Sequence, residues 1–336
     1  MTLRIGLVAA SRIAVKAIIE PLPAVAGVEL TAVGARDLAR AQAAAERWGA
    51  SFALGSYREL IESDEVDAVY VGTPASLHRE WTIAAIEAGK HVLCEKPLAS
   101  NADDARLIAD AARASEVVVM EAFHWRYHPY AVQIRDVVES GVLGRIDRIE
   151  AAFDIPDGHI PRDDIRWDLD LGGGATMDLG CYAIQWVRHA AGAEPDVVSA
   201  EAVCLVDAID GSLGAELRWP SGVTGRIHSS MIGPADTVEA WLRVTGEHGR
   251  MLATNPLGPQ YGGSVISIEV GDRIWYRAGD NSTTYYHQLV AFRDAIATGV
   301  GFSTTADDGV RNMEIIDACY RAAGLEPRPM DAGQVS

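Results

Sequence analysis

The segment that decides the fold is AAIEAGKHVLCEKP, residues 84–97. It reads as the end of a helix closed by Gly89, a short apolar strand at His91–Cys94, and an abrupt charged stop. The residue before a proline is pushed out of the α region, so we expect Lys96 to be extended at the strand's carboxyl end. Ligands of open parallel sheets bind beyond such ends, which makes Lys96 a candidate proton donor. A solvated lysine leaving a strand is the alternative interpretation.

Strand-like and helix-like segments alternate through the first half of the chain. The expected strands are Arg4–Ala9, Val28–Gly34, Val66–Gly72, His91–Cys94 and Val117–Ala122. The expected helices are Leu38–Trp48, Leu77–Ala88 and Ala102–Ala114. Apolar, β-branched strands separated by helices predict βαβ units and a parallel sheet covered on both faces. We assign this sheet to a first domain, residues 1–122.

The first strand-to-helix turn, GLVAASRIA at residues 6–14, is where a dinucleotide pyrophosphate would bind. Against the pattern G-x-G-x-x-G/A, the three positions are Ala9, Ser11 and Ala14, and only the last one fits. Alanine and serine are the smallest replacements for glycine, and we expect both to avoid positive φ. The candidate cofactor residues here are Ala9, Ser11, Arg12 and Ile13. A plain strand-to-helix turn is the alternative.

The end of the second strand distinguishes NADP from NAD. The chain has Arg36 there and Arg40 one helical turn later, and a cation suits the 2′-phosphate of NADP. Asp37 leaves room for NAD, or it caps the following helix. The pattern favours NADP.

After residue 122 the periodicity changes to strands with few helices between them. The expected strands are Arg148–Ile155, Val197–Val206, Ser212–Trp219, Val223–Ser230, Val238–Thr245, Val265–Val270 and Arg273–Arg277, and the expected helices are Ala131–Ser140, Tyr285–Thr298 and Asp307–Leu325. Short turns and partial alternation predict a mostly antiparallel sheet with one open face. We assign residues 123–336 to a second α+β domain and expect the sheet to mediate a homodimer or homotetramer. The last ten residues are expected to be a loose tail.

A glycine-rich insertion, GGGATMDLGCYAIQW at residues 172–186, carries two polar candidates. Asp178 and Tyr182 are four residues apart, so both are expected to project from one helix face. A tyrosine hydroxyl can relay a proton to a carbonyl or alcohol oxygen. The alternative is a buried tyrosine on an amphipathic helix. His124 and His128 have the spacing of a helical metal pair, but a third ligand is not evident, so we expect no metal site.

Composition excludes some classes of partner. The formal charge of −18 over 336 residues disfavours nucleic acid and anionic membranes. Four dispersed cysteines without metal-type spacing suggest a reducing compartment. No apolar run approaches the ~18 residues of a membrane span, so we expect a cytoplasmic protein.

Three motifs together resemble the Gfo/Idh/MocA oxidoreductase family. They are AGKHV–EKP with the preceding GTPASLH (residues 72–78), MEAF at residues 120–123, and GGG…DLG…Y in the insertion. The resemblance is nearest to the branch of dihydrodiol dehydrogenase, glucose–fructose oxidoreductase and sugar ketoreductases. It implies an N-terminal Rossmann domain, a C-terminal open-faced domain, and a bound nicotinamide.

The resemblance also implies roles for individual residues. Lys96 matches the catalytic lysine, Tyr182 the proton relay, and Asp178 an acid that holds substrate hydroxyls. Further cofactor contacts would be Thr73, Pro74, His78 and Glu95, and further substrate contacts Phe123, Trp125, Arg126 and Trp167. The expected reaction is hydride transfer between NADP or NAD and a ring hydroxyl or ketone of a sugar, cyclitol or dihydrodiol. A nicotinamide-dependent glycosidase without net redox and a non-catalytic cofactor-sensing regulator are the alternatives.

Overall fold

The structure, a computed structural model, describes residues 2–206 and 208–329. Within them the chain forms two compact units. The first consists of residues 2–124 and 285–310, and the second of residues 125–284 and 311–329. The first unit is therefore assembled from two separate stretches of chain.

The first unit contains a six-stranded parallel sheet in the order β3-β2-β1-β4-β5-β6. Its strands are β1 (Leu3–Val8), β2 (Val28–Gly34), β3 (Phe52–Leu54), β4 (Ala68–Val71), β5 (His91–Cys94) and β6 (Val119–Glu121). Its main helices are α2 (Leu38–Trp48), α3 (Tyr57–Ile61), α4 (His78–Glu87), α5 (Ala102–Arg113) and α8 (Thr284–Thr298, whose first residue belongs to the second unit). This order, which runs outward in both directions from β1 and β4, is the doubly wound arrangement of a Rossmann sheet.

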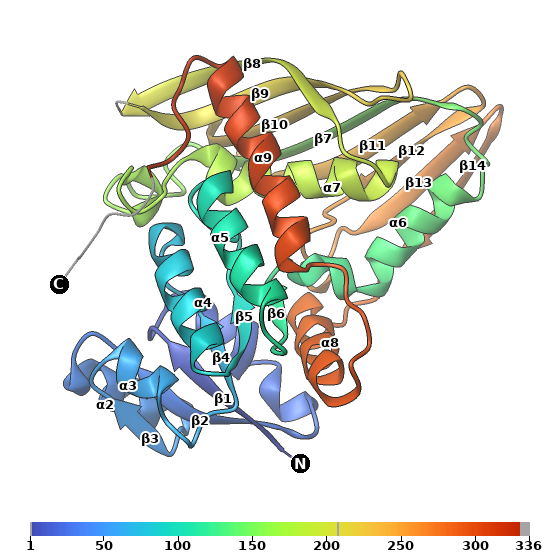
Figure 1. Ribbon diagram of the computed structural model, residues 1–336. Helices are drawn as coiled ribbons and strands as arrows, with labels where there is room; N and C mark the ends of the chain where they lie inside the picture. Colours follow the sequence, from blue (N-terminus) through green and yellow to red (C-terminus); the bar gives the residue numbers. More distant parts are fainter. Residues whose placement is uncertain (1, 207, 330–336) are drawn as a thin grey trace. The chain divides into compact units, whose positions relative to one another are not determined.

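Local sequence accounts for most of these elements. All four residues of β4 are buried, as expected for a strand covered on both faces. The helices begin at side chains that accept a backbone N–H: Asp37 for α2, Ser56 for α3 and Asn101 for α5. Helices α4 and α5 pack side by side (Figure 1).

The second unit contains an eight-stranded sheet in the order β14-β13-β12-β11-β7-β10-β9-β8. Its strands are β7 (Ile146–Pro156), β8 (Asp196–Val206), β9 (Ile209–Arg218), β10 (Thr224–Gly233), β11 (Glu239–Gly246), β12 (Gly249–Thr254), β13 (Val265–Val270) and β14 (Arg273–Ala278). Neighbours are antiparallel except β7 and β10, which are parallel. The mostly antiparallel open sheet confirms the expected fold class.

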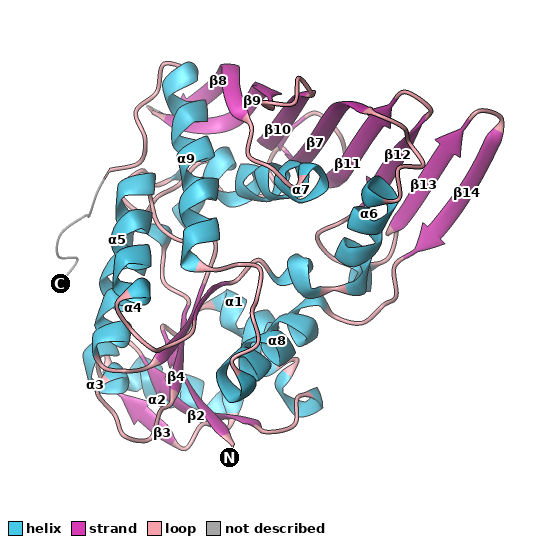
Figure 2. Ribbon diagram, turned by 45° about the vertical axis from the view of Figure 1, so that its right-hand side comes forward, coloured by secondary structure: helices cyan, strands magenta, loops and turns pink. Residues whose placement is uncertain are grey.

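One face of this sheet is covered by α7 (Cys181–Ala191), which packs against β7, β10 and β11 and is drawn beside these strands in Figure 2. Register places Ile149, Ile227 and Leu242 on a common face, and all three are buried. The opposite face carries charged residues that pair across strands, such as Arg148 with Glu216 and Arg243 with Glu150. The sheet is thus apolar toward α7 and ionic on its other side. Helix α6 (Pro129–Glu139) packs against α7.

Three short elements were not expected: β3, α3 and β12. Each is held by pairing or packing with neighbouring elements rather than by a strong local pattern. The expectation of a loose C-terminal tail was wrong for Arg328, which follows α9 (Ala306–Ala322) and is only 2% exposed. Residues 330–336 lie outside the described residues.

Across the described residues, every helix is too short or too polar to cross a lipid bilayer. The four cysteines are free thiols, of which only Cys204 is exposed.

Candidate active site

The turn after β1 adopts a conformation that glycine usually supplies. Ala9 has φ +88°, so the expectation that this residue avoids positive φ was wrong. Ser11 (φ −85°) does avoid it and stands immediately before the helical run that starts with α1 (Arg12–Ala14), on which Arg12 is exposed and Ile13 half-buried. The backbone path of a phosphate-binding turn is therefore kept without its glycine.

Two hydroxyl groups at the carboxyl edge of the sheet fit a bound cofactor. Ser11 Oγ and Thr73 Oγ1 are buried and have no hydrogen-bond partner among the described residues. A Cβ at Gly72 would come within 2.7 Å of Ser11 Oγ, so only glycine leaves room for that hydroxyl. Buried orphan hydroxyls are costly unless a ligand satisfies them. The edge between β1 and β4 is where a dinucleotide binds in this topology.

The residues after β2 indicate which nicotinamide nucleotide is held. Asp37 Oδ1 accepts a hydrogen bond from the Arg40 amide at 2.8 Å, so Asp37 caps α2. Arg36 and Arg40 are both exposed, and both act electrostatically on Tyr57. Although these cations oppose it, burial raises the pKa of Tyr57 above its ordinary value. Two neighbouring guanidinium groups suit a phosphate. The Asp37 carboxylate, which would bind the ribose hydroxyls of NAD, is instead engaged as the helix cap.

The backbone around Lys96 is held by three buried side chains. Glu95 Oε2 accepts from the Lys96 amide at 3.2 Å, and Glu121 Oε1 accepts from the Leu98 amide at 2.7 Å. The His78 ring lies 2.9 Å from the carbonyl oxygens of both Pro97 and Thr73. These contacts fix the backbone of the turn that follows β5. The half-buried side chain of Lys96 therefore starts from a fixed backbone position.

Two of these side chains are engaged within the protein. Glu95 Oε1 accepts from the buried Tyr70 hydroxyl at 2.6 Å, and burial raises the pKa of Tyr70 further than the neighbouring carboxylate does. His78, at the start of α4, links the turn that carries Thr73 and Pro74 to the turn that carries Lys96. His78 and Glu95 thereby support the turns at this edge of the sheet.

His124 is a neighbour of Lys96 that sequence reasoning treated only as a metal candidate. Its ring is buried and stacks on Tyr285, with centroids 4.0 Å apart. Burial, together with the smaller effect of the Lys96 and Lys16 cations, lowers the pKa of His124 to about 3. A neutral imidazole therefore lies within electrostatic reach of the candidate catalytic ammonium.

In the second unit, the helix that carries Asp178 and Tyr182 begins with a π-helical turn, Thr176–Gly180, and continues as α7. Single π turns inside helices recur at functional sites. Tyr182 is 6% exposed and packs against Phe153 and Trp186, with ring centroids 5.9 and 6.2 Å away. The phenol is thus held in place by aromatic contacts.

Arg166 is a site residue that sequence reasoning missed. Its Nε donates to Asp178 Oδ2 at 2.5 Å, and its Nη1 donates to Asp164 Oδ1 at 2.9 Å. The Asp178 carboxylate raises the pKa of Arg166 well above its ordinary value. Arg166 comes from the long segment between β7 and α7, and nothing in its local sequence distinguishes it from other loop arginines.

The π-helical turn is anchored by a buried network. Asp210 Oδ2 accepts from the Thr176 amide at 2.7 Å and from its hydroxyl at 2.6 Å. Arg328 Nε donates to the Gly173 carbonyl at 2.6 Å. A Cβ at Gly174, whose φ is +131°, would collide with both Asp210 and Arg328. The glycine at position 174 therefore permits close backbone approach.

The remaining substrate candidates lie in varied surroundings. Phe123 is fully buried, and Trp125 is 1% exposed and packs edge-on against Trp186. Arg126 hydrogen-bonds the His189 ring and lines a cavity of about 300 Å³. The indole of Trp167 is buried under the Arg162 guanidinium, 4.3 Å from the ring centre.

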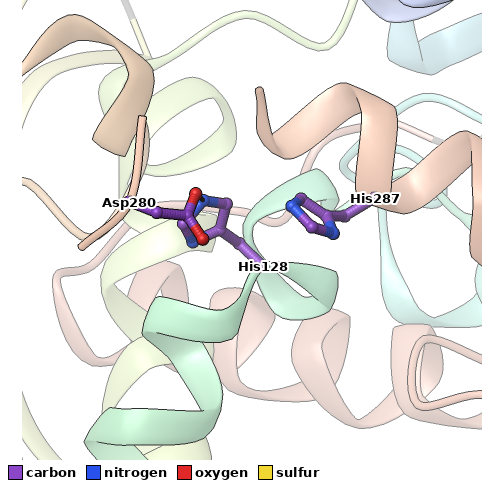
Figure 3. Close-up of side chains that lie close together, drawn as sticks. All are labelled: His128, Asp280 and His287. Carbon is purple, nitrogen blue, oxygen red and sulfur yellow. Dashed lines mark hydrogen bonds and ion pairs between the residues drawn. The ribbon is translucent and has the colours of Figure 1, made fainter. Parts of the chain in front are cut away.

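His128 acts as a helix cap. Its Nδ1 accepts from the Tyr130 amide at 3.0 Å, and its Nε2 donates to Asp280 Oδ1 at 3.1 Å. Figure 3 shows the imidazole facing the Asp280 carboxylate; it also labels His287, a residue of the first unit. His124 lies in the short 3-10 turn His124–Tyr127, and His128 is the extended N-cap of α6, so the two are not one helical pair.

Comparisons with known proteins agree with this fold. A family described as "Oxidoreductase family, NAD-binding Rossmann fold" matches residues 3–123, and the GFO/IDH/MocA C-terminal domain matches residues 131–252. D-xylose 1-dehydrogenase (NADP(+)) 2 of Haloferax volcanii is 36% identical over 325 residues, 95% of this chain and 96% of the relative. Trans-1,2-dihydrobenzene-1,2-diol dehydrogenase of Xenopus laevis is 37% identical over 212 residues, 63% of each chain.

Solved structures give the same result. A 3-ketoreductase from Actinomadura kijaniata in complex with NADP and TDP-benzene has a TM-score of 0.86 at 30% identity and covers 96% of this chain and 98% of its own. With both halves matched in order and relatives aligned over nearly the whole length, the chain belongs to the Gfo/Idh/MocA family of oxidoreductases.

Proposed function

We propose that this chain is an NADP-dependent oxidoreductase that moves a hydride between the nicotinamide and a ring hydroxyl or ketone of a sugar, cyclitol or dihydrodiol-like substrate. The observation that carries the proposal is the position of Lys96. It lies at the carboxyl end of β5, and Glu95, His78 and Glu121 bind the backbone of its turn. Relatives that act on xylose and on dihydrodiols support the substrate range.

The cofactor would be held by residues along one edge of the Rossmann sheet. Ser11 and Thr73 would donate to the pyrophosphate, and the turn at Ala9, Arg12 and Ile13 would accommodate it. Arg36 and Arg40 would bind the 2′-phosphate, which favours NADP over NAD. When bound, the nicotinamide supplies or accepts the hydride. Thr73, Pro74, His78 and Glu95 belong to the turns that would face it.

Side chains of the protein would transfer the proton. Lys96 would donate a proton to the reacting oxygen during reduction and its amine would accept one during oxidation, with Tyr182 as the relay. Asp178 would orient the substrate through its hydroxyl groups. Phe123, Trp125, Arg126 and Trp167 complete the proposed substrate set.

A double-mutant cycle tests the shared role of Lys96 and Tyr182. Single-turnover hydride transfer from NADPH to a keto-sugar is measured for wild type, Lys96→Met, Tyr182→Phe and the double variant. Loss of general acid–base catalysis costs each single variant about 10²- to 10⁴-fold in rate. If both act on one proton, the double variant is about as slow as the slower single variant. Additive losses, or an unchanged rate in Lys96→Met, contradict the proposal.

Incubation with a glycoside and a catalytic amount of NADP separates net redox from the glycosidase alternative. A glycosidase releases sugar without a net change in the nicotinamide absorbance, whereas net redox changes that absorbance in proportion to product.

For the organisation of the chain, we propose a cofactor-binding domain at residues 1–122 and a substrate-binding and oligomerisation domain at residues 123–336, in a cytoplasmic homodimer or homotetramer. Within this division, residues 285–310 belong to the second domain in sequence but to the first compact unit in the fold. The ionic face of the second sheet and exposed apolar side chains on its edge strand β8, such as Val198 and Leu205, support an interface there. Light scattering of the purified protein measures the oligomer mass, and a monomer at micromolar concentration contradicts this assignment.

A further inference from the structure

The stretch that runs from the last residues of β7 to the π-helical turn before α7 has an unusual charge balance. From Asp154 to Asp178 it contains seven aspartates and only two basic residues, Arg162 and Arg166. Both arginines are already neutralised within the segment: Arg162 Nη2 lies 2.7 Å from Asp157, and Arg166 contacts Asp164 and Asp178. This segment, which includes Asp178, therefore has an excess of formal negative charge.

The Arg166–Asp178 pair reaches the surface of the second unit. The side chains are 36% and 16% exposed, so a ligand can contact both. The planar guanidinium offers N–H donors and the adjacent carboxylate offers acceptor oxygens. Neighbouring hydroxyls on a ring each donate and accept, so a fixed donor beside a fixed acceptor matches a vicinal diol. Asp164 Oδ1 accepts a hydrogen bond from Nη1 of the same guanidinium at 2.9 Å, so a second carboxylate restrains its position.

The same charges disfavour a substrate that bears phosphates. A nucleotide sugar carries two negative charges on its diphosphate, and binding normally relies on guanidinium or ammonium groups with charge to spare. Here each arginine of the segment is matched by at least one aspartate, and five aspartates remain in excess. Like charges that meet in a binding site reduce affinity for the wrong partner.

We propose that Arg166 and Asp178 together bind two neighbouring hydroxyls of an uncharged sugar or polyol, and that the acidic segment 154–178 discriminates against nucleotide-diphosphate sugars. This inference rests on the proposed hydride transfer at a sugar ring and specifies its substrate class. Arg166 is accordingly a substrate-binding residue that also orients the Asp178 carboxylate.

The first test compares matched ligands on the NADP-loaded protein by calorimetry and by NADP-linked turnover. D-xylose, D-glucose and myo-inositol are the uncharged probes, and dTDP-D-glucose carries the same ring as glucose with a diphosphate. The expected result is at least one uncharged probe that binds tenfold or more tightly than dTDP-D-glucose. Tighter binding of dTDP-D-glucose, or binding of none of the uncharged probes, overturns the inference.

The second test uses Arg166→Gln with Arg226→Gln as its control. Arg226 also pairs with a carboxylate, Glu216, but lies on the ionic face of the sheet. Arg166→Gln should weaken binding of the uncharged probe at least tenfold and leave the dissociation constant of NADP within twofold, whereas Arg226→Gln should change neither. Equal behaviour of the two variants overturns the role of Arg166.

The outcomes separate the two proposals. Turnover of dTDP-D-glucose alone leaves the proposed oxidoreductase function standing and overturns the substrate class. Selective binding of an uncharged probe without hydride transfer from any substrate supports the substrate class and contradicts the oxidoreductase function.

Discussion

Arg328 Nη2 lies 2.5 Å from Asp210 Oδ1, and both side chains are completely excluded from solvent. The guanidinium also stacks on the Tyr320 ring, 4.1 Å from its centre, and the Tyr320 hydroxyl donates to the same carboxylate oxygen at 3.1 Å. Since Asp210 also binds Thr176, this ion pair joins the C-terminal segment to the first turn of the helix that carries Asp178.

Removal of one partner of this pair should destabilise the protein strongly. Arg328→Met leaves Asp210 charged and buried, which costs about 3–5 kcal/mol of unfolding free energy. Urea denaturation monitored by tryptophan fluorescence measures the loss. The double variant Arg328→Met/Asp210→Asn should recover part of it, because the uncompensated charge is gone. Arg58→Met, at the exposed ion pair with Glu62, is the control and should change stability by less than about 1 kcal/mol.

Because Ala9 has a positive φ, its replacement by glycine should affect stability differently from the same replacement at a helical alanine. Ala9→Gly relieves about 1–2 kcal/mol of strain from the left-handed backbone conformation, which stabilises the folded protein. It also raises the conformational entropy of the unfolded chain, which destabilises the folded protein by about 0.4–1 kcal/mol. The unfolding free energy should therefore stay the same or rise slightly. Ala14→Gly, at a helical φ of −56°, should instead cost about 1 kcal/mol. Thermal denaturation of both variants measures the contrast. Equal losses would show that Ala9 is unstrained.

Cofactor preference should depend on Arg36. Its replacement by alanine removes a charge-assisted contact worth about 1.5–3 kcal/mol, so the NADP dissociation constant should rise roughly 10- to 150-fold. The NAD dissociation constant should change little, because NAD has no 2′-phosphate. Titration of intrinsic fluorescence with each nucleotide gives both constants. Arg47→Ala, in the last turn of α2, the helix that follows Arg36, is the matched control, and a comparable effect there would contradict the assignment.

Acid should destabilise the first unit through His124. Burial lowers its pKa from 6.5 in the unfolded chain to about 3, so the unfolded state binds the extra proton between these values. The unfolding free energy is therefore unaffected by the titration of His124 above pH 6.5. Below that pH it falls by about 1.4 kcal/mol per pH unit until the folded-state pKa is reached. Urea unfolding at several pH values should show a shallower slope for His124→Phe than for wild type. Parallel slopes would mean that another group titrates.

The sequence predicted those parts of the fold whose signals are local. β2, β5, β13 and α2 were expected at their observed bounds, since continuous apolar runs or a helical period lie between clear turn residues. β12 was missed because GRMLAT has few good strand formers, and its pairing with β11 and β13 makes it a strand.

The site was predicted unevenly for a similar reason. Lys96 stands out because a strand, a charge and a proline meet at one point. Arg166 and Arg328 are ordinary surface-type residues in irregular segments, and their partners Asp178 and Asp210 lie 12 and 118 positions away. Only the folded backbone brings these charges together. The positive φ of Ala9 was missed because alanine ordinarily avoids that region.

The assembly of the first unit from two stretches of chain constrains how this protein can be recombined with relatives. The Glu121 amide donates to the Thr304 carbonyl at 2.9 Å, the Thr304 hydroxyl donates back to the Glu121 carbonyl at 2.6 Å, and Met120 bridges to Thr305. A gene fragment that ends at residue 124 would leave the outer edge of β6 bare and prone to pair with other chains. A functional chimaera must therefore import residues 285–310 along with the N-terminal half.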